Sequence, residues 1–318
     1  MLFRSQRRAA LKTLEQAAEK LSPPQRQLFV AQGHEMIGNL DDSERSFREA
    51  VAAAPDDPGV MRSLAAFLVR RGRLTAARDE LQAIISVPRD DPAGLRAHLW
   101  ARRTLAEIAA QSGRYRDAQL ALSLLDENVE REGRLAAEDL ALQIAILAPR
   151  PEPSSWRRAL EVLDRLASIQ PLSTTQRTQK AQLLEQLGRW NECRDELLSI
   201  ASAPNTPPAF VSLLIERLVR HGELGAARIW LKTLSDRLPN APVVAALEAK
   251  LSLAENDRKA AVAAVRRLMP GDAVAPELTG HLGPLAELLE ELGFLTAADK
   301  VFAQYAASSG DGAIARAE

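Results

Sequence analysis

A turn-forming residue recurs along this chain at a spacing of 34 residues or slightly more. Most of these residues are glycine, and the gaps between successive members are 34, 41, 41, 34, 34, 34 and 37 residues. The series consists of Gly38, Gly72, Gly113, Ser154, Gly188, Gly222, Asn256 and Gly293. A fixed period in this range is typical of a protein built from stacked repeats, each of which is one supersecondary unit. The period therefore predicts a fold that grows in one dimension rather than around a single large core.

Small and large apolar residues keep fixed places after each turn residue. Five residues after it, every repeat has a small residue, and nine residues after it every repeat has a large apolar one. The small residues are Ser43, Ala77, Ala118, Ala159, Cys193, Ala227, Ala261 and Ala298. The large residues are Phe47, Leu81, Leu122, Leu163, Leu197, Leu231, Val265 and Phe302. Because a spacing of four residues returns to the same face of a helix, the pattern predicts a buried helical face after every turn.

Another helix is predicted before each turn. Seven residues before the turn residue, six of the seven comparable repeats have alanine, whose small side chain lets two helices approach closely. Proline follows the second helix in most repeats and ends it there. The fourth repeat is the exception, because its first helix, at about residues 135–147, is joined to the second by a loop that contains Pro149, Pro151 and Pro153.

This pattern resembles the tetratricopeptide repeat, a 34-residue helix–turn–helix unit with a small residue in each helix and a proline at its end. The resemblance covers about residues 24–307, although the family's first-helix tryptophan is replaced in the first three repeats by Gln27, Met61 and Arg102. It implies an all-α, right-handed α-solenoid of about eight stacked antiparallel helical hairpins. We therefore expect an extra or capping helix at residues 1–22, the repeat array at residues 23–307 and a flexible tail at residues 308–318.

Composition and charge exclude several classes of function. The chain has 318 residues, of which 46% are hydrophobic, and its 41 basic and 42 acidic side chains give a net charge of −1. Proteins that bind nucleic acid usually have a basic excess, so a nucleic-acid partner is disfavoured. One cysteine and four separated histidines supply neither an internal disulfide nor a structural zinc site. We find no secretory signal and no stretch of about 18 apolar residues, and we expect a cytoplasmic protein.

Sequence motifs for catalysis are missing. The chain has no phosphate-binding glycine loop, no GxSxG, no HExxH and no dinucleotide-binding fingerprint, so we expect neither enzymatic activity nor a cofactor. The acidic pairs Asp56-Asp57 and Asp90-Asp91 each precede a proline in a linker between helices, where a capping or linker role is more common for aspartate than a metal or acid–base role. Cys193 occupies a small-residue position, which predicts a buried and unreactive thiol.

Candidate binding residues lie on the first helices, which line the concave groove in the family that the chain resembles. Basic residues with one tryptophan occur near the first part of this groove, and glutamates occur at its far end. The basic group is Arg62, Arg70, Trp100 and Arg103, and the acidic group is Glu287, Glu290 and Glu291. A partner with an acidic or carboxylate end is predicted near Arg62 and Arg103. The alternative is that all of these are solvated side chains, the more common case for surface charges.

The sequence thus predicts a non-enzymatic scaffold that binds partner peptides or helices in the concave groove. One alternative is an oligomerisation or structural module that acts through uncapped ends. It is suggested by Val301, Phe302 and Tyr305 in the last helix, which would leave a bare C-terminal face for self-association or would mark an excised segment. A second alternative is a regulatory or sensor domain of a larger protein.

Overall fold

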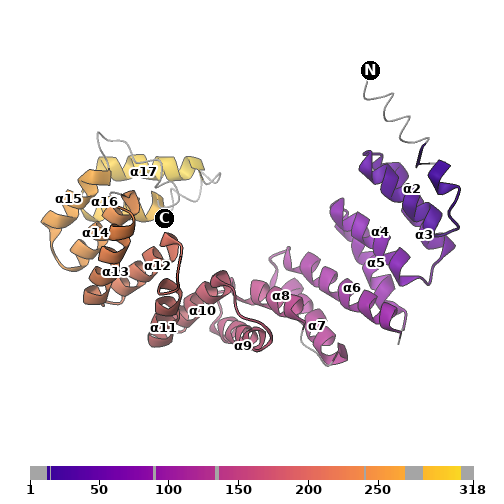
Figure 1. The fold of residues 1–318 in the computed structure, drawn as a ribbon, viewed down its shortest axis with the longest axis horizontal. Helices are drawn as coiled ribbons and strands as arrows, with labels where there is room; N and C mark the ends of the chain where they lie inside the picture. Colours follow the sequence, from indigo (N-terminus) through magenta and orange to yellow (C-terminus); the bar gives the residue numbers. More distant parts are fainter. Residues whose placement is uncertain are drawn as a thin grey trace, which may run out of the picture. The chain divides into compact units, whose positions relative to one another are not determined.

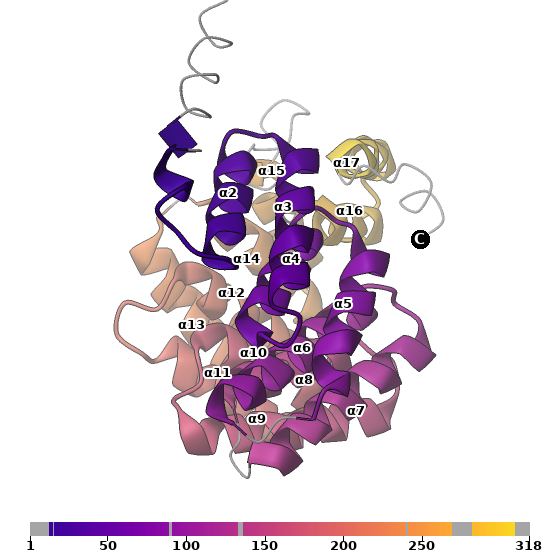
Figure 2. The ribbon, with the colours of Figure 1, turned by 90° about the vertical axis from the view of Figure 1, so that its right-hand side faces the viewer.

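The computed structural model of the chain describes residues 13–308, with the exception of residues 15, 89–90, 133–135, 240 and 269–281. The described residues form α-helices joined by turns and loops, and none of them lies in a β-strand. The chain divides into two compact units, residues 1–171 and residues 172–318. Within each unit the helices lie in consecutive pairs (Figure 1), and in the turned view α2 can be followed beside α3 and α16 beside α17 (Figure 2). Each unit is therefore an all-α stack of helical hairpins.

Four hairpins make up the described part of the first unit, and the two helices of each hairpin contact one another. They are α2 (Gln25–Met36) with α3 (Leu40–Ala53), α4 (Pro58–Arg70) with α5 (Leu74–Ser86), α6 (Pro92–Ala110) with α7 (Tyr115–Glu132), and α8 (Ala137–Leu147) with α9 (Pro153–Ile169). The second helix of one hairpin contacts the first helix of the next, as α3 does with α4 and α5 with α6. The unit is therefore a continuous stack, as expected for a solenoid.

The second unit repeats the same plan with four further described hairpins. They are α10 (Thr174–Gln186) with α11 (Trp190–Ala201), α12 (Pro208–Arg220) with α13 (Leu224–Arg237), α14 (Pro242–Ala254) with α15 (Arg258–Leu268), and α16 (Leu282–Glu291) with α17 (Leu295–Ser308). The first helices of this unit also contact one another, since α14 touches both α12 and α16. The tail expected at residues 308–318 lies outside the described residues beyond Ser308.

The N-terminal helix expected at residues 1–22 is described only in part. Residues 13–14 and 16–18 are helical, and residues 1–12 lie outside the described part of the chain. The side chain of Leu14 packs against Gly33 of α2 so closely that a Cβ atom at residue 33 would lie 2.3 Å from a Leu14 methyl carbon. The absence of a side chain at Gly33 therefore allows the N-terminal segment to pack on the first hairpin.

Most hairpins close at a residue in the left-handed backbone region. The six turn glycines have φ between 68° and 82°, and Asn256 has φ of 62°. In the second hairpin the N–H of Gly72 donates to Val69 O at 2.9 Å and the N–H of Arg73 donates to Leu68 O at 3.0 Å. These two bonds satisfy the last carbonyl groups of α4 and end the helix. Glycine suits the position because a side chain in this region costs about 1–2 kcal/mol.

The fourth hairpin closes in another way, and the prediction of a turn at Ser154 is wrong. Helix α9 begins at Pro153, so Ser154 lies in its first turn, and the connection from α8 consists of residues 148–152. Proline is well suited to the first position of a helix, because the N–H that it lacks has no partner within the helix. In this hairpin, therefore, a proline that begins the second helix takes the place of the left-handed turn residue of the other hairpins.

The two spacings of 41 residues are accommodated by longer helices. Helix α6 has 19 residues and α7 has 18, whereas α4 and α5 have 13 each. Helix α6 is six residues longer than α4 and α7 is five residues longer than α5, so most of each seven-residue expansion lies within a helix. The small and large positions of the affected second helices, Ala118, Leu122, Ala159 and Leu163, are buried.

The small residues of both helices lie in the core, as the sequence pattern predicts. The eight small residues after the turns are at most 4% exposed, and the seven residues at the first-helix position are at most 1% exposed. In the first hairpin these two positions touch directly, because Ser43 Oγ donates a hydrogen bond to Ala31 O at 2.8 Å. The first and second helices therefore cross closely at these side chains.

Ala77→Leu is expected to lower the free energy of unfolding by about 1–3 kcal/mol, since the added carbons overpack the fully buried contact of α4 with α5. Ala141→Leu, at an exposed position of α8, is the control and should change that free energy by less than about 0.5 kcal/mol. Urea unfolding followed by circular dichroism measures both. Equal stability of the two variants would contradict the close crossing.

Candidate functional site

Two hollows lie on the first helices. The first, which we call the α4–α6 pocket, has a volume of about 620 Å³ and belongs to the first unit. Its lining residues are Asp56, Asp57, Pro58, Gly59, Arg62, Asp91, Ala93, Arg96 and Ala97. The second, the α12–α16 groove, has a volume of about 310 Å³ and belongs to the second unit. Its lining residues are Glu216, Val219, Arg220, Lys250, Leu253, Ala254, Glu287, Leu288 and Glu291.

Two aspartates of the α4–α6 pocket cap the helices that form it. Asp57 Oδ1 accepts hydrogen bonds from the N–H groups of Gly59, at 2.8 Å, and Val60, at 3.2 Å. Asp91 Oδ1 accepts hydrogen bonds from the N–H groups of Ala93 and Gly94, both at 2.9 Å. Of the capping and linker roles considered for these aspartates, Asp57 and Asp91 have the capping role. Asp90 lies outside the described residues.

Arg62 and Trp100, both singled out from the sequence, lie together at this pocket. The guanidinium carbon of Arg62 is 4.8 Å from the centre of the Trp100 ring, a cation–π contact between α4 and α6. Trp100 is half-buried against the core of the first hairpins, which holds the ring in place. Arg96, four residues before Trp100, also lines the pocket and was missed in the sequence. Its spacing from Trp100 on one helical face is the signal that could have revealed it.

Arg70 lies outside the pocket lining and binds a neighbouring hairpin. Its Nε and Nη2 atoms donate to the two carboxylate oxygens of Glu35 at 2.9 and 2.8 Å, which joins the ends of α2 and α4. The second unit has a related contact, in which Glu185 of α10 accepts from Arg217 at 2.9 Å and from His221 at 3.1 Å. The guanidinium of Arg70 is thus part of a link between adjacent first helices.

Arg103 is directed into a buried polar network. Its Nε donates to Asp139 Oδ1 of α8 at 2.5 Å, and this hydrogen bond raises the pKa of Arg103. The other carboxylate oxygen of Asp139 accepts from Asn128 Nδ2 of α7 at 3.3 Å, and the same amide donates to Leu99 O at 3.1 Å. Asp139 and Asn128 are buried. The structure therefore uses Arg103 to neutralise a core carboxylate and does not place it in the lining of the α4–α6 pocket.

Further polar contacts surround this network at the lengthened hairpins. The buried Arg102 donates from Nε to Glu127 at 3.1 Å. Asp126 accepts from Gln143 Nε2 at 2.9 Å and from Arg158 at 2.7 Å. The longer helices α6 and α7 thus add hydrogen bonds between neighbouring elements. No sequence signal distinguished these residues, because a polar side chain in a helical pattern is usually solvated.

The glutamates predicted from the sequence lie on α16 of the second unit. Glu287 and Glu291 line the α12–α16 groove, whereas Glu290 is exposed on the same helix and is not part of the lining. Opposite them, Lys250 Nζ donates to Glu216 Oε1 at 2.9 Å and so joins α14 to α12. Glu287 and Glu291 form no ion pair or hydrogen bond with the described residues.

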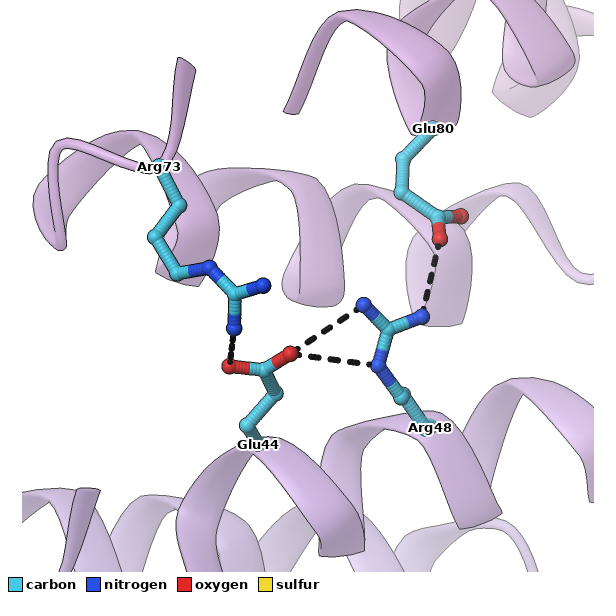
Figure 3. A network of polar contacts seen from close by, with 4 residues as sticks. All are labelled: Glu44, Arg48, Arg73 and Glu80. Carbon is cyan, nitrogen blue, oxygen red and sulfur yellow. Dashed lines mark hydrogen bonds and ion pairs between the residues drawn. The ribbon is translucent and has the colours of Figure 1, made fainter. Parts of the chain in front are cut away.

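On the second helices of the first hairpins, charged side chains bind one another. Glu44 of α3 accepts from Arg48 at 3.1 Å and from Arg73 at 2.5 Å, and Arg48 also pairs with Glu80 of α5 at 3.5 Å (Figure 3). Burial raises the pKa of Glu80, although the charge of Arg48 opposes that shift. Such exposed pairs contribute about 0–1 kcal/mol each. These pairs connect adjacent hairpins, and the charged groups in them already have partners within the protein.

Cys193 is the buried thiol that the sequence predicts. It is 1% exposed in α11, and burial raises its pKa to about 11. A thiol with this pKa is protonated at neutral pH and is a poor nucleophile.

The described residues contain neither a metal-binding cluster nor a membrane-spanning helix. Among them, no three histidine, cysteine, aspartate or glutamate side chains are placed to bind a metal ion together. None of the described helices is both long enough and apolar enough to span a membrane.

One family model matches part of the chain. Residues 38–99 match the family described as tetratricopeptide repeat, and this stretch runs from the first turn glycine into α6. A search of curated proteins found no match. Among solved structures, the chain is similar to a tetratricopeptide repeat protein from Parabacteroides merdae, with a TM-score of 0.47 and 14% identity over 84% of this chain and 98% of that chain.

Two other solved structures are similar at comparable levels. One is PilW, a type IV pilus biogenesis factor, with a TM-score of 0.42 and 16% identity over 65% of this chain and 92% of that chain. The other is a human IFIT1 dimer with PPP-AAAA, with a TM-score of 0.39 and 15% identity over 87% of this chain and 66% of that chain.

Arg103→Met is expected to lower the free energy of unfolding by about 2–4 kcal/mol, because it leaves the buried Asp139 carboxylate without its cation. Arg70→Met removes the more exposed pair with Glu35 and is the matched control, with an expected loss of about 0–1 kcal/mol. Urea unfolding of both variants gives the comparison. Equal losses would show that Arg103 does not neutralise a core carboxylate.

The thiol of Cys193 is expected to make stability fall at alkaline pH. Its pKa rises from 9.0 to about 11 on folding, so between these values the unfolded chain loses the thiol proton and the folded chain keeps it. The free energy of unfolding of the wild type should therefore fall by about 2 kcal/mol more than that of Cys193→Ala from pH 9 to 11. Urea unfolding across this range measures the difference, and parallel pH profiles would contradict the burial of the thiol.

Proposed function

We propose that this chain, of which residues 38–99 match the tetratricopeptide repeat family, is a non-enzymatic scaffold that binds a segment of a protein partner on its first helices. The tetratricopeptide repeat fold generally mediates protein–protein interactions. One observation carries the proposal. The α4–α6 pocket and the α12–α16 groove are lined only by first helices and the residues directly before them. A hollow between packed helices is preformed, which lowers the ordering cost of binding a peptide or helix.

The α4–α6 pocket offers the features that suit an acidic group of a partner. Arg62 is held by the face of the Trp100 ring, and neither Arg62 nor Arg96 forms an ion pair with the described residues. Two guanidinium groups that share a pocket suit bidentate recognition of a carboxylate. Asp56, Asp57 and Asp91 also line this pocket. The Oδ1 atoms of Asp57 and Asp91 accept capping hydrogen bonds from α4 and α6, and Asp56 interacts with another group of the protein. In this proposal Arg96 takes the role that the sequence suggested for Arg103.

Self-association through the C-terminal face is the rival function, and it stays a prediction. Val301 is buried and Phe302 is half-buried in the core formed by α14 to α17, so these two side chains do not form an exposed apolar surface. The side chain of Tyr305 lies outside the described residues. A regulatory role within a larger protein and a cytoplasmic location likewise stay predictions.

Arg62→Glu is expected to reduce partner capture at least about tenfold, because it reverses the charge that faces the α4–α6 pocket. Capture from a lysate of the source cells, quantified by mass spectrometry, compares the wild type, Arg62→Glu and Arg116→Glu. Arg116 is exposed on the second helix α7 and serves as the matched control. The informative proteins are those captured by the wild type and by Arg116→Glu but lost with Arg62→Glu.

Two outcomes would contradict the proposal. Equal capture by all three forms would show that the first-helix pocket binds no partner, and a selective loss with Arg116→Glu would place the binding surface on the second helices. Light scattering of the wild type over a range of concentrations tests the rival, since concentration-dependent association that Arg62→Glu leaves intact would favour a structural module.

A further inference from the structure

We propose that the α12–α16 groove binds a basic segment of a protein partner, with a lysine or arginine side chain of that segment held between Glu287 and Glu291. The inference rests on the proposed function for the kind of ligand, a protein segment. It adds where in the second unit the segment binds and which charge it carries.

The groove is built from corresponding faces of three consecutive hairpins. Each of α12, α14 and α16 contributes three lining residues. Glu216 and Lys250 are 34 residues apart, which is one repeat, and Glu287 follows in the next repeat. In each helix the lining includes a pair four residues apart, such as Glu287 and Glu291, and such a pair lies on one helical face. The groove is therefore a continuous surface across first helices that contact one another.

The groove also has an apolar component. Val219 of α12 and Leu253 of α14 are half-buried, and Leu288 of α16 is buried. Lysine and arginine side chains carry long aliphatic stems that pack on apolar surface while the charged end reaches a polar group. A basic side chain can thus contact these residues and the carboxylates of α16 together.

The basic side chains that line the groove have partners within the protein, whereas two of its acidic side chains have none among the described residues. Both cations in the lining have partners within the protein, since Lys250 binds Glu216 at 2.9 Å and Arg220 lies 3.5 Å from Glu185. Glu287 and Glu291 have no ion pair or hydrogen bond with the described residues. The open charge of the groove is accordingly negative, which is complementary to a basic ligand.

The spacing of the two open glutamates adds a second reason. Like charges four residues apart on a helix repel one another and destabilise it. A cation bound between Glu287 and Glu291 would relieve this repulsion, so binding is favoured beyond the contact itself. A metal ion is the less suitable cation, because no set of three ligating side chains exists among the described residues.

The test uses two fluorescein-labelled peptides of about 12 residues, one of repeating Leu-Lys-Ala and one in which glutamate replaces every lysine. Fluorescence anisotropy measures their binding to the full chain. We expect the lysine peptide to bind the wild type and the glutamate peptide not to bind. Glu287→Gln/Glu291→Gln should weaken binding of the lysine peptide by roughly tenfold or more, because both open carboxylates are removed.

Glu290→Gln is the matched control for a general attraction between acidic protein and basic peptide. It removes the same charge from the same helix at an exposed position outside the groove, and it should weaken binding less than about twofold. Circular dichroism of each variant verifies that the helices are intact.

The single variants Glu287→Gln and Glu291→Gln are measured as well, because each removes one charge, as Glu290→Gln does. The inference fails if Glu290→Gln weakens binding as much as either of them. It also fails if the glutamate peptide binds better than the lysine peptide, or if neither peptide binds. None of these results affects the proposed function as long as partner capture depends on Arg62. Loss of that dependence, with the lysine peptide still bound in the groove, would instead overturn the role of the α4–α6 pocket alone.

Discussion

The close crossing of the two helices within each hairpin is the contact on which the rest of the structure depends. In most hairpins one small residue of each helix is buried there, although α12 has Ile215 at this position. In the first hairpin Ser43 Oγ donates to Ala31 O across the crossing. A larger residue at either position would separate the helices and shift the surface on which the next hairpin packs. Because a stacked array contacts only its neighbours, no central core exists to absorb such a shift. The left-handed turn residues support the same geometry, since they end the first helix and reverse the chain.

The stacking of the hairpins also determines where many charged residues find their partners. Many of them bind partners about one repeat away, as Glu35 does with Arg70 and Glu216 with Lys250. Exposed pairs contribute little free energy, so their effect is mainly to match neighbouring hairpins to each other. Charged side chains that have such a partner are less available to a ligand than charged side chains that have none. Few groove charges remain open in the described residues, and among them are Glu287 and Glu291.

The success of sequence-based prediction differed between the fold and the candidate site. The turn glycines and the small buried residues followed from local rules, namely the backbone freedom of glycine and the helical period. The turn at Ser154 was wrong because Pro153 starts α9 at this connection. The buried network around Asp139 and Asn128 had no signal, since polar residues in a helix are normally solvated. Only the packing of the lengthened helices places them in the core.

The arginines of the first helices show which features the sequence determines and which depend on the tertiary structure. By itself the sequence determined the hairpins, their turns and the faces they bury, because each depends on residues close together in the chain. It treated Arg62 and Arg103 as equivalent candidates, since both are arginines at the same position of successive repeats. Only the tertiary structure decided between them, because neighbouring helices place different groups beside each one. Arg62 meets the face of the Trp100 ring at a pocket, and Arg103 meets the buried carboxylate of Asp139.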